Sequence, residues 1–171
     1  MEDLVKGYLE NFRELLRREA ELVKSILGLE EEKYDALKQV NVKDLLSINS
    51  REEDLLQFMD GVERQRKELL LLLARAFGFE PENTLSQMLA NVPDDPFAVL
   101  KNELLALREE IKSSSSKLQV TMKENSGMVK ANLEIINLTL QFANRHAIKE
   151  TYDYRSRRGA RENITIINQI A

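Results

Sequence analysis

An unbroken heptad seam in the first half of the chain predicts a long α-helix. Ten positions separated alternately by three and four residues make up this seam: Leu45, Ile48, Glu52, Leu55, Met59, Val62, Arg66, Leu69, Leu73 and Ala76. Such spacing keeps one side of a helix turned toward a partner helix, as in coiled coils. Gly78 and Pro81 follow the seam, and both residue types end helices. We therefore expect a helix over residues 42–78.

Two further apolar patterns predict long helices on either side of this seam. The pattern over residues 4–40 is interrupted by Glu19 and Lys33. The pattern over residues 97–148 begins with leucines, turns polar near Ser114 and becomes apolar again after Met128. Serine side chains compete for backbone hydrogen bonds, so the run of four serines at 113–116 is compatible with a bend or a local opening.

The segments between these helices predict how the helices are arranged. The link near Asn41 is short, and short links join antiparallel neighbours. Residues 79–96 form a longer connector with room for one short helix at 84–91, closed by Pro93 and Pro96. We therefore expect an all-α fold. Within it, we expect residues 1–150 to form an antiparallel three-helix bundle of coiled-coil-like helices, and residues 151–171 to form a C-terminal tail.

The overall composition excludes several classes of protein. The chain has 171 residues, a net charge of -4 and no cysteine, which excludes disulfides and thiolate metal sites. An acidic chain lacks the large cationic surface that general nucleic-acid binding or anionic membranes require. The longest apolar run, residues 69–74, is far shorter than the roughly 20 residues that span a bilayer. Acidic residues at the N-terminus do not resemble a signal peptide. We expect a cytoplasmic protein without stable membrane insertion and without a nucleic-acid partner.

No group of residues predicts catalysis or a cofactor. His146 is the single histidine, and its neighbours Arg145 and Lys149 offer no carboxylate to orient it. Glycine-rich phosphate loops and nucleophile motifs are missing from the sequence. The acidic cluster at residues 30–32 is interpreted as a solvated helix face. We expect neither an enzyme nor a bound cofactor or metal.

Polar residues within the seams leave two interpretations open. Glu52 and Arg66 either fix the register or partner of the second helix, or lie at the edge of the bundle with their charged ends in water. Asn125 and Asn132 lie one heptad apart on the third helix. They either pair across the core or line a face that is meant for a partner.

The composition changes after Glu150, where four arginines and two tyrosines precede an isoleucine-rich end. The isoleucines have helical spacing at 164, 167 and 170 and strand spacing at 164 and 166. They therefore fit a short amphipathic helix, a strand added to a partner, or a segment that folds back onto the chain's own bundle. The arginines with Tyr152 and Tyr154 could also contact RNA by stacking and phosphate contacts.

Three segments together resemble the FlgN family of flagellar export chaperones over nearly the full length. These are residues 52–56 continuing into 64–70, the stretch Asn-Leu-Glu-Ile-Ile-Asn at 132–137, and Thr-Tyr-Asp-Tyr at 151–154 with Gly159. The resemblance implies a cytosolic chaperone of type III export. Its partners would be the C-terminal helical region of hook-filament junction (hook-associated) proteins, with export-gate components as further candidates. The basic run at 155–161 and the isoleucine-rich end depart from the family pattern.

The resemblance also implies which residues bind the client. The candidates on the third helix and in the tail are Asn132, Ile136, Leu140, Ala143, Tyr152, Tyr154, Gly159, Ile164, Ile166, Ile167 and Ile170. Two other hypotheses compete with this one. The first is a coiled-coil structural or adaptor protein that self-associates through the second seam, and the second is an RNA-associated helical protein. The oligomeric state is left open.

Overall fold

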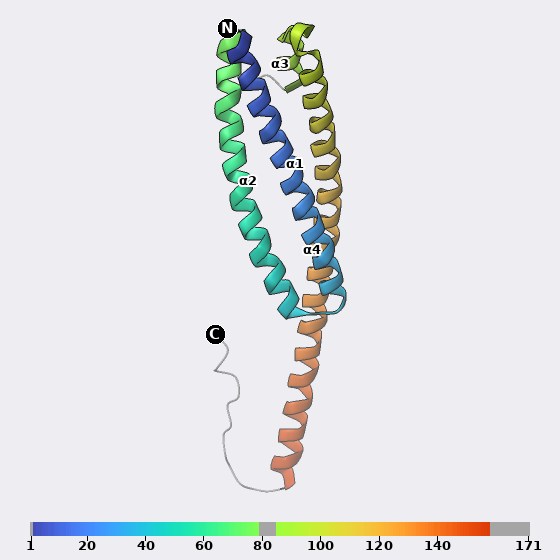
Figure 1. The fold of residues 1–171 in the computed structure, drawn as a ribbon. Coiled ribbons are helices and arrows are strands. Elements are labelled where there is room, and N and C mark those ends of the chain that lie inside the picture. The colour runs from blue at the N-terminus through green and yellow to red at the C-terminus, as the bar shows by residue number, and fades with distance from the viewer. Residues whose placement is uncertain (1, 79–84, 158–171) are drawn as a thin grey trace. The chain divides into compact units, whose positions relative to one another are not determined.

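The computed structural model describes the backbone of residues 2–78 and 85–157. Its side chains are described as far as Asn144, apart from those of residues 2, 3, 86 and 91. Four helices follow one another: α1 (Glu2–Lys38), α2 (Val42–Phe77), α3 (Leu85–Asn91) and α4 (Asp94–Arg157) (Figure 1). These ranges contain no strand, so the predicted all-helical class is confirmed.

Both ends of α2 are set by the residue types that the sequence places there. At its start, the side-chain oxygen of Asn41 accepts a hydrogen bond from the backbone N–H of Asp44 at 3.3 Å. At its end, Gly78 adopts a left-handed conformation with φ 69°, and its N–H donates to the carbonyl of Ala74 at 2.8 Å. The predicted end of the second helix at Gly78 is therefore confirmed.

The helix α4 differs from the prediction in two respects. Asp95 and Pro96 have non-helical backbone angles, so the regular helix starts at Phe97 as expected, but it continues to Arg157 and not to 148. No proline or glycine lies between Gly127 and Arg157 to stop it. The helix is also uninterrupted through the serine run, where Ser116 Oγ donates to the carbonyl of Lys112 at 2.9 Å. Such a bond to the preceding turn satisfies a hydroxyl without opening the helix.

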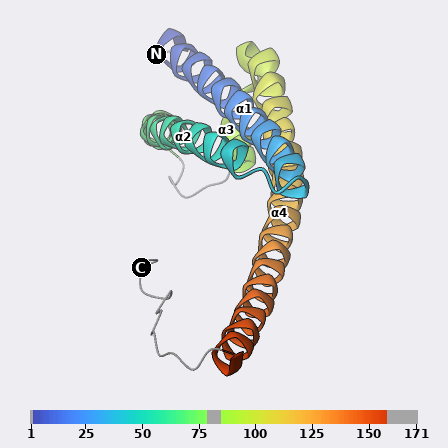
Figure 2. The ribbon, with the colours of Figure 1, turned by 90° about the horizontal axis from the view of Figure 1, so that it is seen from below.

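The chain divides into two compact units, residues 1–128 and 129–171. In the first unit, α1 lies between α2 and the first part of α4 (Figures 1 and 2). Its main core draws on all four helices, with Phe12, Leu73, Met88 and Leu104 almost completely buried. A smaller cluster of Leu29, Ala36 and Ile48 lies near the turn between α1 and α2. No helix in the described part of the chain is long and apolar enough to cross a membrane.

Candidate partner-binding site

One face of α4 is buried in the first unit. Leu100 and Leu104 belong to the main core, and Leu107 and Ile111 pack against it. The same face, followed at intervals of three and four residues, reaches Leu118, Met122 and Asn125. Its apolar periodicity is therefore that of a helix side built for packing against other helices.

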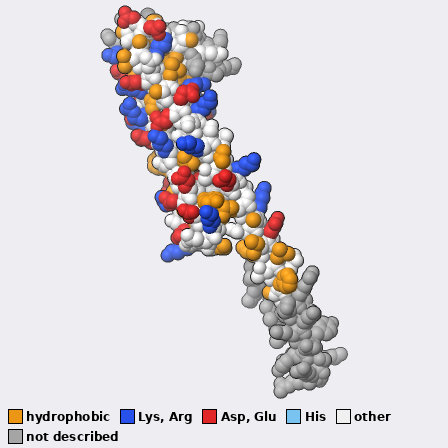
Figure 3. Space-filling model, turned by 90° about the vertical axis from the view of Figure 1, so that its right-hand side faces the viewer, with side chains coloured by type: hydrophobic (Ala, Val, Ile, Leu, Met, Phe, Trp, Pro, Cys, Tyr) orange, Lys and Arg blue, Asp and Glu red, His pale blue; other side chains and the backbone are white. Residues whose placement is uncertain are grey.

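In the second unit this periodicity continues, but the side chains are exposed. We call Val129, Leu133, Ile136 and Leu140 the first stripe, and their exposed fractions are 41%, 54%, 46% and 56%. Figure 3 shows hydrophobic side chains at the surface of α4 just before the residues drawn in grey. Contiguous exposed apolar surface on a protein marks an interaction site more often than scattered single residues do.

A second set of apolar side chains lies on another side of the same segment. Ile135, Leu138 and Phe142 form this second stripe, with exposed fractions of 61%, 56% and 62%. At 3.6 residues per turn, its centre lies about 160° around the helix from the first stripe. Lys130 and Glu134 are the charged residues of the segment 129–144. A helix that is apolar on two sides and nearly uncharged needs cover on both sides.

The structure places four of the predicted site residues in this segment. Ile136 and Leu140 are exposed members of the first stripe, and Ala143 is exposed beyond them. Asn132 is partly exposed and engaged in an interaction. Val129 and Leu133 were missed as site residues, although tracing the spacing of Ile136 and Leu140 backwards leads directly to them.

The other predicted site residues divide into two groups. Tyr152 and Tyr154 were expected in a tail but belong to the last turns of α4, so the helix end at 148 was placed too early. Gly159 and the four isoleucines Ile164, Ile166, Ile167 and Ile170 lie outside the described residues.

A buried polar cluster holds α4 against α1 and α2 within the first unit. Asn125 is 3% exposed, and its Nδ2 donates to both the backbone carbonyl and Oε2 of Glu30, at 2.7 and 2.6 Å. Lys33 Nζ donates to Glu30 Oε1 at 2.9 Å and to Glu52 Oε2. The cluster therefore joins side chains from three helices, and the pairing interpretation of Asn125 is the one observed.

The acidic and basic groups of this cluster shift each other's ionisation. Burial works against ionisation of Glu30, but hydrogen bonds from Lys33 and Asn125 outweigh it and lower its pKa. Burial raises the pKa of Glu52, because its bond to Lys33 offsets the cost only in part. Against the effect of burial, the two carboxylates raise the pKa of Lys33. Glu30 is 5% exposed, so the expectation that residues 30–32 form a solvated face is wrong for Glu30.

The charged residues that interrupt the apolar pattern of α1 form ion pairs with the charged residues that interrupt the seam of α2. Lys33 contacts Glu52 in the polar cluster, and Glu19 Oε2 lies 3.2 Å from Nε of Arg66. Burial raises the pKa of Glu19, and the charge of Arg66 offsets this in part. Since the side chain of Glu52 is only 12% exposed, it does not extend into water at the bundle edge. These pairs match one helix to the other in a single register.

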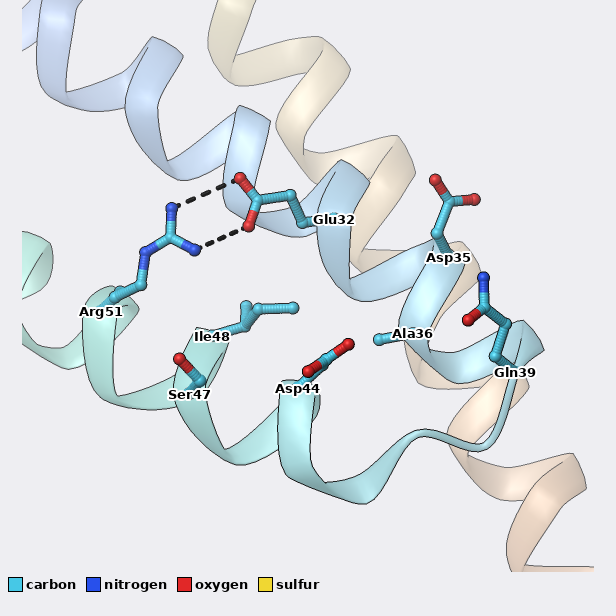
Figure 4. Close-up of a pocket in the computed structure, with 8 residues that line it drawn as sticks. All are labelled: Glu32, Asp35, Ala36, Gln39, Asp44, Ser47, Ile48 and Arg51. Carbon is cyan, nitrogen blue, oxygen red and sulfur yellow. Dashed lines mark hydrogen bonds and ion pairs between the residues drawn. The ribbon is translucent and has the colours of Figure 1, made fainter.

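A hollow of about 390 Å³ lies between α1 and α2 near their connecting turn (Figure 4). Arg51 and Glu32 face each other across it, joined by two hydrogen bonds of 2.7 and 3.3 Å. Asp35 and Asp44 add carboxylates, and Ser47 has no histidine beside it in the lining. The lining therefore offers no histidine base to activate Ser47 as a nucleophile. No group of residues that could hold a metal ion occurs in the part of the chain that the structure describes.

The chain was compared with known protein families. The model of the family described as FlgN protein matches residues 1–158. This chain belongs to the FlgN family. No curated protein and no solved structure shows significant similarity to it. This match confirms the family resemblance seen in the sequence. FlgN is a family of flagellar export chaperones and not an enzyme family.

Proposed function

We propose that this FlgN protein is a cytosolic chaperone of type III export for hook-filament junction proteins. In this proposal the C-terminal helical region of the client lies along the first stripe of α4. The observation that carries it is the exposure of Val129, Leu133, Ile136 and Leu140 at the same helical spacing that buries Leu100 and Leu104. A client helix with anchors at i, i+3, i+4 and i+7 would cover the stripe in the way the core covers the earlier leucines.

The size of the stripe suits reversible binding. Each of its four side chains is roughly half exposed, so covering one contributes about 1 kcal/mol, and the stripe about 4 kcal/mol before ordering costs. Tighter binding needs further contacts. The candidates are Asn132 and Ala143 on the helix and, as the family resemblance implies, Tyr152, Tyr154, Gly159 and the tail isoleucines. A tail that orders only on the client loses entropy at that moment, which keeps the complex reversible.

The first unit supports this function as a scaffold. We propose that α1, α2 and α4 act together as an antiparallel three-helix bundle that presents the stripe. The seam of α2 is largely used inside this unit, because Ile48, Val62, Leu69 and Leu73 are buried there. This occupied seam leaves little surface for the alternative of a self-associating coiled-coil adaptor. Export-gate components remain candidate partners for the complex.

Titration calorimetry with C-terminal fragments of hook-associated proteins tests the proposal. The double variant Ile136→Ala with Leu140→Ala removes two half-exposed anchors, so we expect a Kd about 30-fold weaker. The matched control is Leu46→Ala with Val99→Ala, two exposed apolar residues elsewhere in the chain, with 66% and 73% exposure, and it should leave Kd unchanged.

Two results would contradict the proposal. No binding heat with any client fragment, at protein concentrations on the order of tens of micromolar, would refute the client assignment. Equal loss of affinity in both double variants would show that the stripe is not the binding surface.

A further inference from the structure

The second stripe of α4 is not explained by a single client helix. A helix packed on the first stripe covers one side of α4, whereas Ile135, Leu138 and Phe142 lie about 160° away. All three are more than half exposed, and the segment around them is nearly uncharged. Another apolar element must cover this side if it is not to remain in water.

The chain itself supplies a segment of matching chemistry. Residues 158–171 follow directly after α4 in the sequence and carry four isoleucines. When the segment is extended, Ile164, Ile166 and Ile170 face one side of it, and Ile167 faces the other. An apolar segment so close to an apolar stripe has a high effective concentration for it.

The lengths of the two segments restrict how they can meet. Phe142 lies fifteen residues before the end of α4, which corresponds to about 22 Å of helix. If residues 158–160 form the turn, an extended chain of about 3.3 Å per residue reaches about 20 Å at Ile166, close to the level of Phe142. It reaches about 33 Å at Ile170, level with Ile135.

A helical return of the same residues is too short. From Arg157 to Ile170 a helix spans only about 20 Å, and the turn that reverses direction shortens it further. Gly159 lies where the chain must reverse just after α4, and glycine accepts the backbone angles of such a turn. The matching lengths therefore favour an extended return.

We propose that, in the protein without client, residues 158–171 turn and run back along α4 in extended form, and place Ile166 and Ile170 on the second stripe. The first stripe then stays free. This inference rests on the proposed function only in assigning the first stripe to the client. While they lie on the second stripe, the isoleucines are close to a client that binds to the first stripe. They can then move from α4 onto that client.

A tryptophan reporter in the full-length chain tests the proposal without any client. The chain has no tryptophan, so Leu138→Trp gives a single probe on the second stripe and Leu133→Trp a matched probe on the first. We expect blue-shifted emission and weak acrylamide quenching for the probe at 138. Both should be lost when Ile166→Asp and Ile170→Asp are added. The charge-matched pair Asn163→Asp and Thr165→Asp, on the opposite face of the extended segment, should leave them intact, and the probe at 133 should respond to neither pair.

Cysteine pairs give a second measurement, since the chain has no cysteine of its own. Ile166→Cys should form an intramolecular disulfide with Phe142→Cys under mild oxidation and not with Leu140→Cys on the first stripe. Equal quenching at 138 and 133, or crosslinking to both partners alike, would overturn the proposal. Protection that depends on protein concentration, or crosslinks between chains, would assign the second stripe to a second copy and overturn it as well.

Discussion

Lys33→Met should destabilise the fold strongly, because Lys33 is the cation shared by two buried carboxylates. Its Nζ contacts Glu30 and Glu52, whose side chains are only 6% and 12% exposed. Methionine keeps the apolar length of the lysine side chain and its helix propensity but removes the charge. Glu30 then keeps Asn125 as its hydrogen-bond partner, and Glu52 loses its cation.

The expected cost follows from leaving charges buried without a partner. Removing one member of a buried ion pair costs about 3 to 5 kcal/mol, and the lower end applies here because Lys33 is 15% exposed. We therefore expect the unfolding free energy at pH 7 to fall by about 3 kcal/mol, measured by urea denaturation followed by circular dichroism.

The loss should shrink when the pH is lowered. Lys33 lowers the pKa of both Glu30 and Glu52, so its removal leaves burial as the main influence and raises both in the folded state. A carboxyl whose folded-state pKa lies above its unfolded-state pKa stabilises the fold increasingly as the pH falls from 7 toward about 4.5. The variant should therefore regain stability between pH 7 and pH 5 relative to the unaltered protein.

The exposed pair between Lys67 and Glu63 provides the control. Their atoms are 2.7 Å apart, but the side chains are 68% and 45% exposed, so Lys67→Met should leave the unfolding free energy unchanged. If Lys33→Met has no larger effect than Lys67→Met, or if its deficit does not depend on pH, the buried cluster does not have the energetic role described above.

Substitutions at three further positions test other features of the first unit. Gly78→Ala should cost about 1 kcal/mol of unfolding free energy, because alanine is disfavoured at the positive φ of 69°, whereas no atom lies within 4 Å of the added Cβ. Thermal melting measures this cost. An unchanged Tm would show that the left-handed cap is not required. Asn41→Ala should cost about 1 kcal/mol through loss of the α2 cap, and Asn41→Ser, which keeps a side-chain oxygen for the cap, should recover most of it. Glu19 has a pKa raised mainly by burial, so it stabilises the fold increasingly as the pH falls from 7 toward 4.5. Glu19→Gln should remove that part of the pH dependence, which urea denaturation at pH 7 and pH 5 would reveal.

The helices could be predicted because their signals are local. The seam of α2, the glycine at 78 and the prolines of the connector each act within a few residues, and they place the helix boundaries closely. The predicted end of the third helix at 148 is too early, because a change in composition such as that after Glu150 does not itself end a helix. Composition changed there, but no helix-breaking residue occurs before Gly159.

The polar cluster could not be predicted in the same way. Glu30 and Asn125 are separated by 95 residues, and nothing local to either one identifies the other as its partner. The sequence showed only that charged or amide residues interrupted three separate seams. Their pairing depends on the relative rotation of three helices, which spacing along one helix does not determine. The first stripe could be predicted only in part. Its helical periodicity can be read from the sequence, but the sequence does not show whether a periodic apolar face is buried or exposed in the folded chain.

The uneven division of the core has a consequence for how the first unit opens. Fourteen buried residues form the cluster shared by all four helices, whereas three form the cluster next to the turn between α1 and α2. Free energies of local opening follow the density of buried apolar contacts. Amide protons near residues 36–48 should therefore exchange with solvent through small fluctuations, while those around Leu73 and Leu104 exchange only when the whole unit unfolds. The turn between α1 and α2 would therefore open locally many times for each complete unfolding event.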